Sequence, residues 1–147
     1  MKRQNFEIAT TLEATDILKN CRLVVTTTPS SEPLLHAREL QPGTHITAVG
    51  SDTPHKQELD SAILGRADLV VADSIPQCLE RGEISKAVQS DHLSQEELVE
   101  LGEIISGKVP GRTAEDQITV ADLTGVAVQD IQIAKAVYEA LNSPGIA

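Results

Sequence analysis

The chain of 147 residues is 40% apolar, which is sufficient for one domain with a hydrophobic core. Its formal net charge of −10 disfavours binding to nucleic acids or anionic membranes, because both require clustered Lys and Arg to neutralise phosphates. Since the chain has one Phe, one Tyr and no Trp, its core must consist of Val, Ile, Leu and Ala, which favours a parallel sheet covered by helices.

The cysteines and the first residues bear on the compartment. Cys21 and Cys78 match neither a CxxC pair nor a zinc-binding pattern, so we expect two buried thiols in a reducing environment. Residues 1–5 include two basic side chains, but no apolar stretch follows them, which argues against a signal peptide. No later run approaches the roughly 20 apolar residues that a membrane span needs. We therefore expect a cytoplasmic protein.

The first half of the chain alternates strands and helices. A short strand is expected at 6–9, a helix ending near Asn20, and a β-branched strand over 22–26 that the prolines of the following loop stop. A Pro-Gly turn at 42–43 then leads into a strand over 45–49, which ends at Gly50.

The second half continues the alternation. Thr53 and Pro54 are expected to cap and start a helix that closes at Gly65. After a strand over 68–72, a short helix should run from Pro76 to Gly82, and another should begin at Ser94, where Ser94 and Glu97 have the spacing of a capping box. A strand over 118–121 precedes a last helix over 126–141.

This order predicts an α/β fold, a three-layer open parallel sheet with helices on both faces. Sheets of this kind bind ligands beyond the carboxyl ends of their strands. Three polar segments directly follow predicted strands, at 26–30, 50–54 and 122–125. We expect these segments to converge on one edge of the sheet.

The last predicted helix is apolar around most of its circumference. A helix of this kind requires burial on more than one side. We therefore expect a second chain or another domain to pack against it.

Asp52 follows the strand over 45–49 and lies close to a predicted helix N-terminus. A carboxylate there can exchange protons with a bound substrate if its surroundings tune its pKa. It can also simply cap the next helix, and the spacing alone favours this second interpretation.

The motifs around Asp52 instead favour its role in proton transfer over its role as a helix cap. Residues 45–59, HITAVGSDTPHKQEL, resemble the signature block of the ornithine cyclodeaminase and mu-crystallin family. Nearly the whole chain shares the resemblance, because further family motifs occur in the same order and spacing: Thr26-Thr27-Thr28-Pro29-Ser30, Arg66-Ala67-Asp68, Gln77, Gly82-Glu83, Pro110-Gly111-Arg112 and residues 122–130.

The resemblance implies an NAD(P)-dependent site for amino acids or imines. Family members include ornithine cyclodeaminase, which forms proline and ammonia, alanine dehydrogenases, and ketimine and cyclic-imine reductases. By this resemblance Asp52 is the catalytic carboxylate and Gly125 contacts the substrate. The resemblance implies cofactor contacts at Thr28, Ile46, Thr47, Ala48, Val49, Lys56 and Thr124.

Each of these positions also has a simpler explanation. Thr28 and Gly125 can serve as turn formers, Ile46 and Val49 as core residues, and Lys56 as a solvated helix residue. His55, where many relatives have Gly, is expected to be a surface variation. The spacings of His36, His45 and His92 give no metal-binding pattern, so we expect no metal.

The resemblance also implies that parts of the family's architecture lie outside residues 1–147. The glycine-rich turn that approaches the cofactor pyrophosphate has no counterpart here, nor has the N-terminal domain that holds substrate and forms much of the dimer interface. We therefore expect a single partial, Rossmann-like NAD(P)-binding domain. It should form homo-oligomers, most simply dimers, and have weak or no activity alone.

Two alternatives remain open at this stage. The chain can be a non-catalytic half-domain that dimerises or regulates a relative, or another chain can supply the other half of the site. The sequence decides neither the substrate nor the choice between NAD and NADP.

Overall fold

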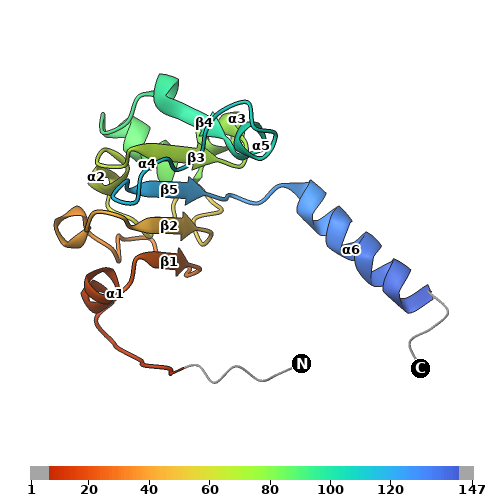
Figure 1. Ribbon diagram of the computed structural model, residues 1–147, viewed down its shortest axis with the longest axis horizontal. Coiled ribbons are helices and arrows are strands. Elements are labelled where there is room, and N and C mark those ends of the chain that lie inside the picture. The colour runs from red at the N-terminus through yellow and green to blue at the C-terminus, as the bar shows by residue number, and fades with distance from the viewer. Residues whose placement is uncertain (1–6, 143–147) are drawn as a thin grey trace.

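The computed structural model describes residues 7–142, and a parallel sheet lies at its centre (Figure 1). The strand order is β1-β2-β5-β3-β4, and every neighbouring pair runs parallel. This confirms the predicted α/β class and the parallel sheet. The strands are β1 Leu23–Thr26, β2 His45–Ala48, β3 Leu69–Ala72, β4 Leu98–Glu100 and β5 Thr119–Asp122.

Short helices connect the strands, and one long helix follows the last of them. They are α1 Ala14–Asn20, the 3-10 turn η1 Ala37–Glu39, α2 Ser61–Leu64, α3 Ile75–Cys78, α4 Gly82–Gln89, the 3-10 turn η2 Gln95–Glu97, α5 Leu101–Ile105 and α6 Ala127–Asn142.

The topology places most of the helices on one face of the sheet. The connections β1–β2, β2–β3 and β3–β4 all run in the same direction along the strand order. Right-handed crossovers therefore put these connections on the same face of the sheet. The core lies between these connections and the strands: Leu18, Leu59, Ile63 and Ile84 pack with Val24, Ile46, Val70 and Val120.

The opposite face is only partly covered. The connection from β4 to β5 runs back across the sheet, and it brings α5 over β3 and β5. Here Leu101 and Ile104 line an open groove of about 410 Å³ above the sheet. On the edge strand β1, the side chains of Leu23 and Val25 are 70% and 59% exposed.

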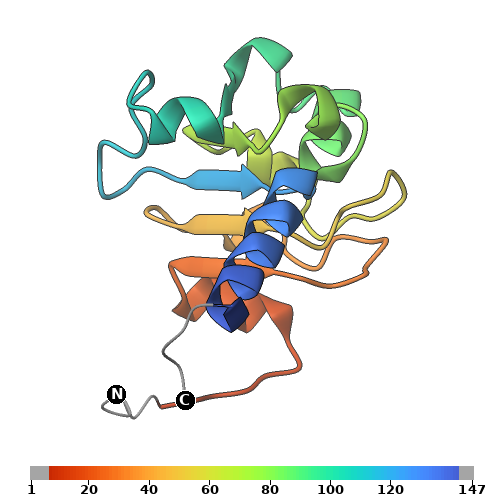
Figure 2. The ribbon, with the colours of Figure 1, turned by 90° about the vertical axis from the view of Figure 1, so that its right-hand side faces the viewer.

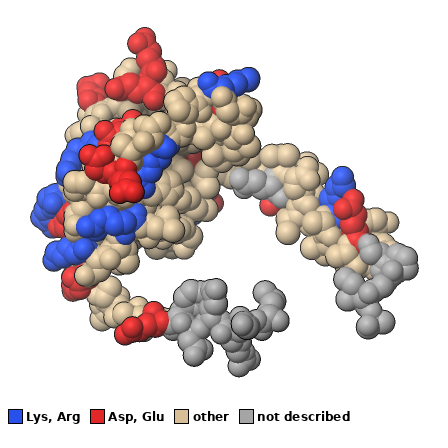
Figure 3. Space-filling view, viewed as in Figure 1, with Lys and Arg blue, Asp and Glu red and all other residues tan. Residues whose placement is uncertain are grey.

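Helix α6 extends beyond the carboxyl ends of the strands, away from the sheet (Figures 1 and 2). Most of its visible surface is uncharged, interrupted by a charged cluster that includes the Lys135–Glu139 pair at 3.8 Å (Figure 3). The helix predicted at 126–141 is therefore confirmed, and its large apolar side chains are exposed in this structure: Val128, Ile131, Ile133, Val137, Tyr138 and Leu141.

Two predicted features of the first 65 residues are wrong. The strand expected at 6–9 is not formed over 7–9, because this segment pairs with no other strand; Phe6 lies outside the described residues. The helix expected from Thr53 begins only at Ser61, because Asp60 rather than Thr53 accepts a hydrogen bond from a helical amide, that of Ala62 at 3.0 Å.

Two further corrections concern the middle of the chain. Gly82 was expected to end a helix, but it starts α4, which the sequence pattern did not predict. The capping box of Ser94 and Glu97 is present, but it opens only the turn η2. Strand β4 follows where a helix was expected, because Val99 pairs with Val71 in the sheet.

Asp122 explains why α4 begins at Gly82. Its side chain lies at the end of β5, 1% exposed, and its Oδ2 accepts a hydrogen bond from the amide of Ile84 at 2.8 Å. Gly82 has a φ of +89°, and a Cβ there would lie 2.5 Å from the same oxygen. Burial, more than the nearby Glu83 and Asp73 carboxylates, raises the pKa of Asp122 to about 8.

Replacing Gly82 with Ala should therefore destabilise the fold through both backbone strain and overlap. Gly107 is a matched control, because its φ is +75° and a Cβ there would meet no atom within 4 Å. We expect Gly107→Ala to lower the free energy of unfolding by about 1 kcal/mol, and Gly82→Ala by about 3 kcal/mol or more. Urea denaturation measures both, and equal losses would contradict the close approach to Asp122.

Asp122 should also make stability depend on pH. Because its pKa is raised in the folded state, its stabilising contribution is complete below the unfolded value of about 3.9 and is lost as pH rises towards 8. Asp122→Asn keeps an acceptor for the Ile84 amide and does not titrate. Wild type should thus lose stability relative to this variant between pH 4 and 8 in urea denaturation, and a pH-independent difference would refute the assignment.

Candidate functional site

The three polar segments that follow β1, β2 and β5 lie side by side at the carboxyl edge of the sheet. The amide of Val49 donates to the carbonyl of Thr26 at 2.9 Å, and the amide of Leu123 donates to that of Ala48 at 2.8 Å. The predicted convergence is therefore confirmed. This edge is the place where open parallel sheets bind ligands.

Asp52 lies in the segment that follows β2 and is exposed to solvent. Its Oδ1 forms an ion pair with Lys56 Nζ at 2.6 Å. The hydrogen bond from Lys56 chiefly lowers the pKa of Asp52, and the charges of Lys56 and Arg81 act in the same direction. Asp52 is therefore an accessible carboxylate that is charged at neutral pH and can accept a proton.

The structure excludes the simpler interpretation of Asp52 as a helix cap. Residues 53–55 form a bend and turn, and the next helix starts at Ser61 with Asp60 as its cap. Asp52 is thus free of the structural role that its spacing suggested.

Glu58 lies directly beneath this segment and is fully buried. Its Oε1 accepts a hydrogen bond from the amide of Thr28, and its Oε2 accepts one from the amide of Gly50 at 2.9 Å. One carboxylate thus joins the loop after β1 to the loop after β2.

Glu83, which is 1% exposed, supports Glu58 from below. Its carboxylate accepts hydrogen bonds from the amides of Glu58 at 2.7 Å and Leu59 at 3.1 Å, and from the hydroxyl of Ser51. Burial raises the pKa of Glu83 above its ordinary value, although these hydrogen bonds act in the opposite direction.

The third segment is held by Asp73, at the end of β3. Asp73 accepts hydrogen bonds from the Thr124 hydroxyl at 3.2 Å and from the Gly125 amide at 2.9 Å. Gln77 donates to the same two residues, to Thr124 Oγ1 at 2.6 Å and to the Gly125 carbonyl at 2.7 Å. Gly125 itself has a φ of +84° and open space where a Cβ would lie.

The strand residues of the predicted site face different ways. The side chains of Ile46 and Ala48 are buried in the core, which leaves only their main-chain atoms for contact with a ligand. Thr47 points to the opposite face, where its hydroxyl contacts His45 Nε2 at 3.0 Å. Val49 is 40% exposed at the carboxyl end of the strand.

The remaining predicted residues lie at the carboxyl edge. The half-buried Thr28 accepts a hydrogen bond from the Ser30 amide, Lys56 binds Asp52, and Thr124 and Gly125 share Asp73. Their roles towards a cofactor or substrate stay predictions.

The motifs of the sequence assign no role to the carboxylates that hold these loops: Glu58, Glu83, Asp73 and Asp122. Glu58, Glu83 and Asp122 lie within family motifs, but a motif does not show which groups they bind. The partners of Glu83 lie 24 to 32 residues away in sequence, so no short motif contains them.

The two cysteines differ from each other. Cys78 is buried as expected, and burial raises the pKa of its thiol to about 12, so it is uncharged and unreactive. Cys21 is exposed at the end of α1, so the expectation that it is buried is wrong.

Metal and membrane sites find no support among the described residues. Within 7–142, no three His, Cys, Asp or Glu side chains are grouped so that they could hold a metal ion. The helices in this range are also too short or too polar to cross a bilayer.

Comparison with known proteins identifies the family. The model of the ornithine cyclodeaminase/mu-crystallin family matches residues 1–145. The chain is 41% identical over 133 residues to an alanine dehydrogenase of Archaeoglobus fulgidus, and 38% identical over 135 residues to a Δ1-pyrroline-2-carboxylate reductase of Bacillus cereus. Each match covers 90% of this chain but only 41% of the relative.

Solved structures agree with these matches. An archaeal alanine dehydrogenase dimer with bound NAD superposes with a TM-score of 0.79 at 42% identity, covering 86% of this chain and 39% of that one. The iminosuccinate reductase of Paracoccus denitrificans in complex with NAD+ gives a TM-score of 0.81 at 35% identity, covering 87% and 39%. The chain belongs to the ornithine cyclodeaminase/mu-crystallin family.

Proposed function

We propose that this chain builds the nicotinamide side of an NAD(P)-dependent site for amino acids or imines, with Asp52 as the proton-transfer residue. The observation that carries the proposal is the position of Asp52: it is exposed, charged and paired with Lys56 at the carboxyl edge of the sheet. Relatives over this same region are an alanine dehydrogenase and an imine reductase, both with NAD bound.

The residues present fit the nicotinamide end of such a cofactor. Val49 offers a partly exposed apolar side chain beside Asp52, and the space around Gly125 is open. Thr28 is half-buried in the loop after β1, while the side chain of Thr124 is buried, which leaves its main-chain atoms for contact with a cofactor. A bound nicotinamide would supply hydride transfer, while this chain's residues would orient the ring and handle the proton.

Asp52 can accept a proton but has none to donate at neutral pH. The hydrogen bond from Lys56 chiefly holds its pKa below the ordinary range, so the carboxylate is charged before substrate arrives. In an amino-acid dehydrogenase or cyclodeaminase, water or an amine that attacks an imine carbon must lose a proton, and Asp52 would take it.

The proposal covers one part of a larger site. The chain spans 41% of the length of the two curated relatives named above. We therefore propose a partial Rossmann-like domain whose turnover alone is weak or absent, and which assembles as a homodimer. The residues that select the substrate determine which reaction the whole site catalyses. It is either cyclodeamination or the oxidation and reduction of amino acids and imines.

A second candidate function is a non-catalytic module that dimerises or regulates a relative. The observation that favours it is the exposed apolar surface of α6, together with the open edge at β1. It predicts strong self-association without binding of NADH.

Asp52→Asn tests the proton-transfer role. We expect this variant to bind NADH within about twofold of wild type, while NAD+ reduction with L-alanine, in which the water that attacks the imine carbon must lose a proton, slows by about 10² to 10⁴, the usual contribution of a general base. Asp91→Asn is the control, because Asp91 is exposed, with a φ of 56° that Asn tolerates. Full activity of Asp52→Asn would refute the assignment, and strong self-association of wild type without NADH binding would favour the second candidate.

Lys56→Gln should raise the pKa of Asp52, because it removes the group that chiefly lowers it. A carbon-detected NMR titration of the Asp52 carboxyl measures this directly, and the midpoint should move to higher pH. The matched control is Lys135→Gln, which removes the other lysine paired at i,i+4, on α6. An unmoved midpoint in Lys56→Gln would show that the ion pair does not tune Asp52.

A further inference from the structure

Glu58 occupies the junction between two loops of the proposed site. Its side chain is 0% exposed, yet both carboxylate oxygens bind main-chain amides from separate loops, those of Thr28 and Gly50. Its own carbonyl oxygen also accepts hydrogen bonds from the amides of Leu34 at 2.8 Å and Leu35 at 3.2 Å. Glu58 therefore accepts three hydrogen bonds from the segment after β1 and one from the loop after β2.

The two loops approach each other so closely that no side chain fits between them. A Cβ on Gly50 would overlap the carbonyl oxygen of Thr28 and would lie 2.6 Å from the Glu58 carboxylate. The separation between the loops is thus set by Gly50 and by the length of the Glu58 side chain.

Burying a carboxylate without a cation is unfavourable unless hydrogen bonds compensate for it. The partners of Glu58 are amide groups, and charge-assisted bonds of this kind are the stronger class. Glu83 fixes Glu58 in turn by accepting its amide at 2.7 Å, while also binding Ser51, the neighbour of Asp52. Such an arrangement fixes geometry rather than providing an accessible chemical group.

We propose that Glu58 is a positioning residue that sets the distance between Thr28 and the Asp52 loop, and thereby the surface that the two loops together present to the cofactor. This inference rests on the function proposed above. The carboxylate does not meet the ligand; it holds the main chain of both loops, with Glu83 as its support.

Glu58→Gln separates this role from simple packing. The amide side chain has almost the same shape, but its NH₂ group must face one of two N–H donors, so one of the two bonds is lost. Glu58→Asp retains the charge but is one methylene shorter and cannot span both amides. It provides the test if Glu58→Gln fails to fold.

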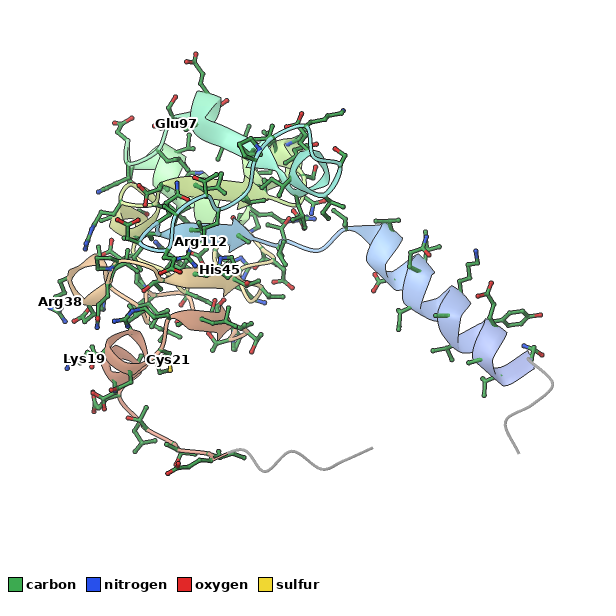
Figure 4. The ribbon with its side chains drawn as sticks, in the orientation of Figure 1. Lys19, Cys21, Arg38, His45, Glu97 and Arg112 are labelled. Atoms are coloured by element: carbon green, nitrogen blue, oxygen red, sulfur yellow. The ribbon has the colours of Figure 1, made fainter. Side chains whose placement is uncertain are left out.

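Glu97→Gln is the matched control. Glu97 also accepts a main-chain amide, that of Ser94 at 2.9 Å, but it lies beside β4, at the opposite edge of the sheet from β1 (Figure 4). Gln serves in capping boxes as well as Glu, so this variant should behave as wild type.

The experiment combines amide hydrogen exchange with NADH titration of the full chain. In Glu58→Gln, we expect the amide that faces the new NH₂ group, either that of Thr28 or that of Gly50, to exchange at least about tenfold faster while those of α4 are unchanged, since one ordinary hydrogen bond corresponds to roughly that factor. The dissociation constant for NADH should rise by a similar factor in protein that remains folded.

The outcomes separate the two proposals. Faster exchange of the Thr28 or Gly50 amide with weakened NADH binding supports the positioning role; wild-type exchange or wild-type affinity in Glu58→Gln overturns it. If wild type binds no NADH, the proposed function fails for this chain, and exchange alone decides. Acceleration confined to these two loops then supports the role, and wild-type exchange overturns it.

Discussion

Buried carboxylates that accept main-chain hydrogen bonds hold the carboxyl edge of this sheet in shape. Glu58 joins the loops after β1 and β2, Glu83 fixes Glu58, and Asp122 caps α4 from the end of β5. These groups replace what longer helices provide in larger domains, because α2 and α3 have only four residues each. Without them, the loops that carry the site would have few contacts to define their positions.

The buried and the exposed carboxylates of the site differ in the direction of their pKa shifts. It raises the pKa of Glu83 and Asp122, whereas the exposed Asp52 has its pKa lowered by Lys56. The acid that can react with a substrate is therefore the accessible one, and the buried acids stabilise its surroundings. This division explains why the chain places so many carboxylates at one edge of a sheet.

The sequence predicted the features that depend on local pattern. The strands over 22–26, 45–49, 68–72 and 118–121 and helix α6 were found within about two residues, because apolar periodicity and turn residues mark them. The sequence-based prediction was wrong where a residue far away in the chain determines the local structure. Strand β4 exists because Val99 pairs with Val71, and α4 begins at Gly82 because Asp122 reaches it from 40 residues away.

The candidate site shows the same difference between features set by local pattern and features set by distant partners. The convergence of three loops followed from the strand order, and Asp52 was found through a motif. The supporting carboxylates Glu58 and Glu83 had no recognisable role until their partners came together in space. A motif points to the group that we propose to react, whereas the groups that hold its loop are found from hydrogen bonds across the fold.

The central claim is that residues 27–30, 49–56 and 123–126 form the nicotinamide side of a cofactor site, and an NADH titration followed by amide NMR tests it most directly. The account predicts saturable binding, with shifts concentrated in these three segments and around Val49. Shifts centred instead on the groove lined by His45 and Thr119, or no saturable binding by the folded chain, would contradict it.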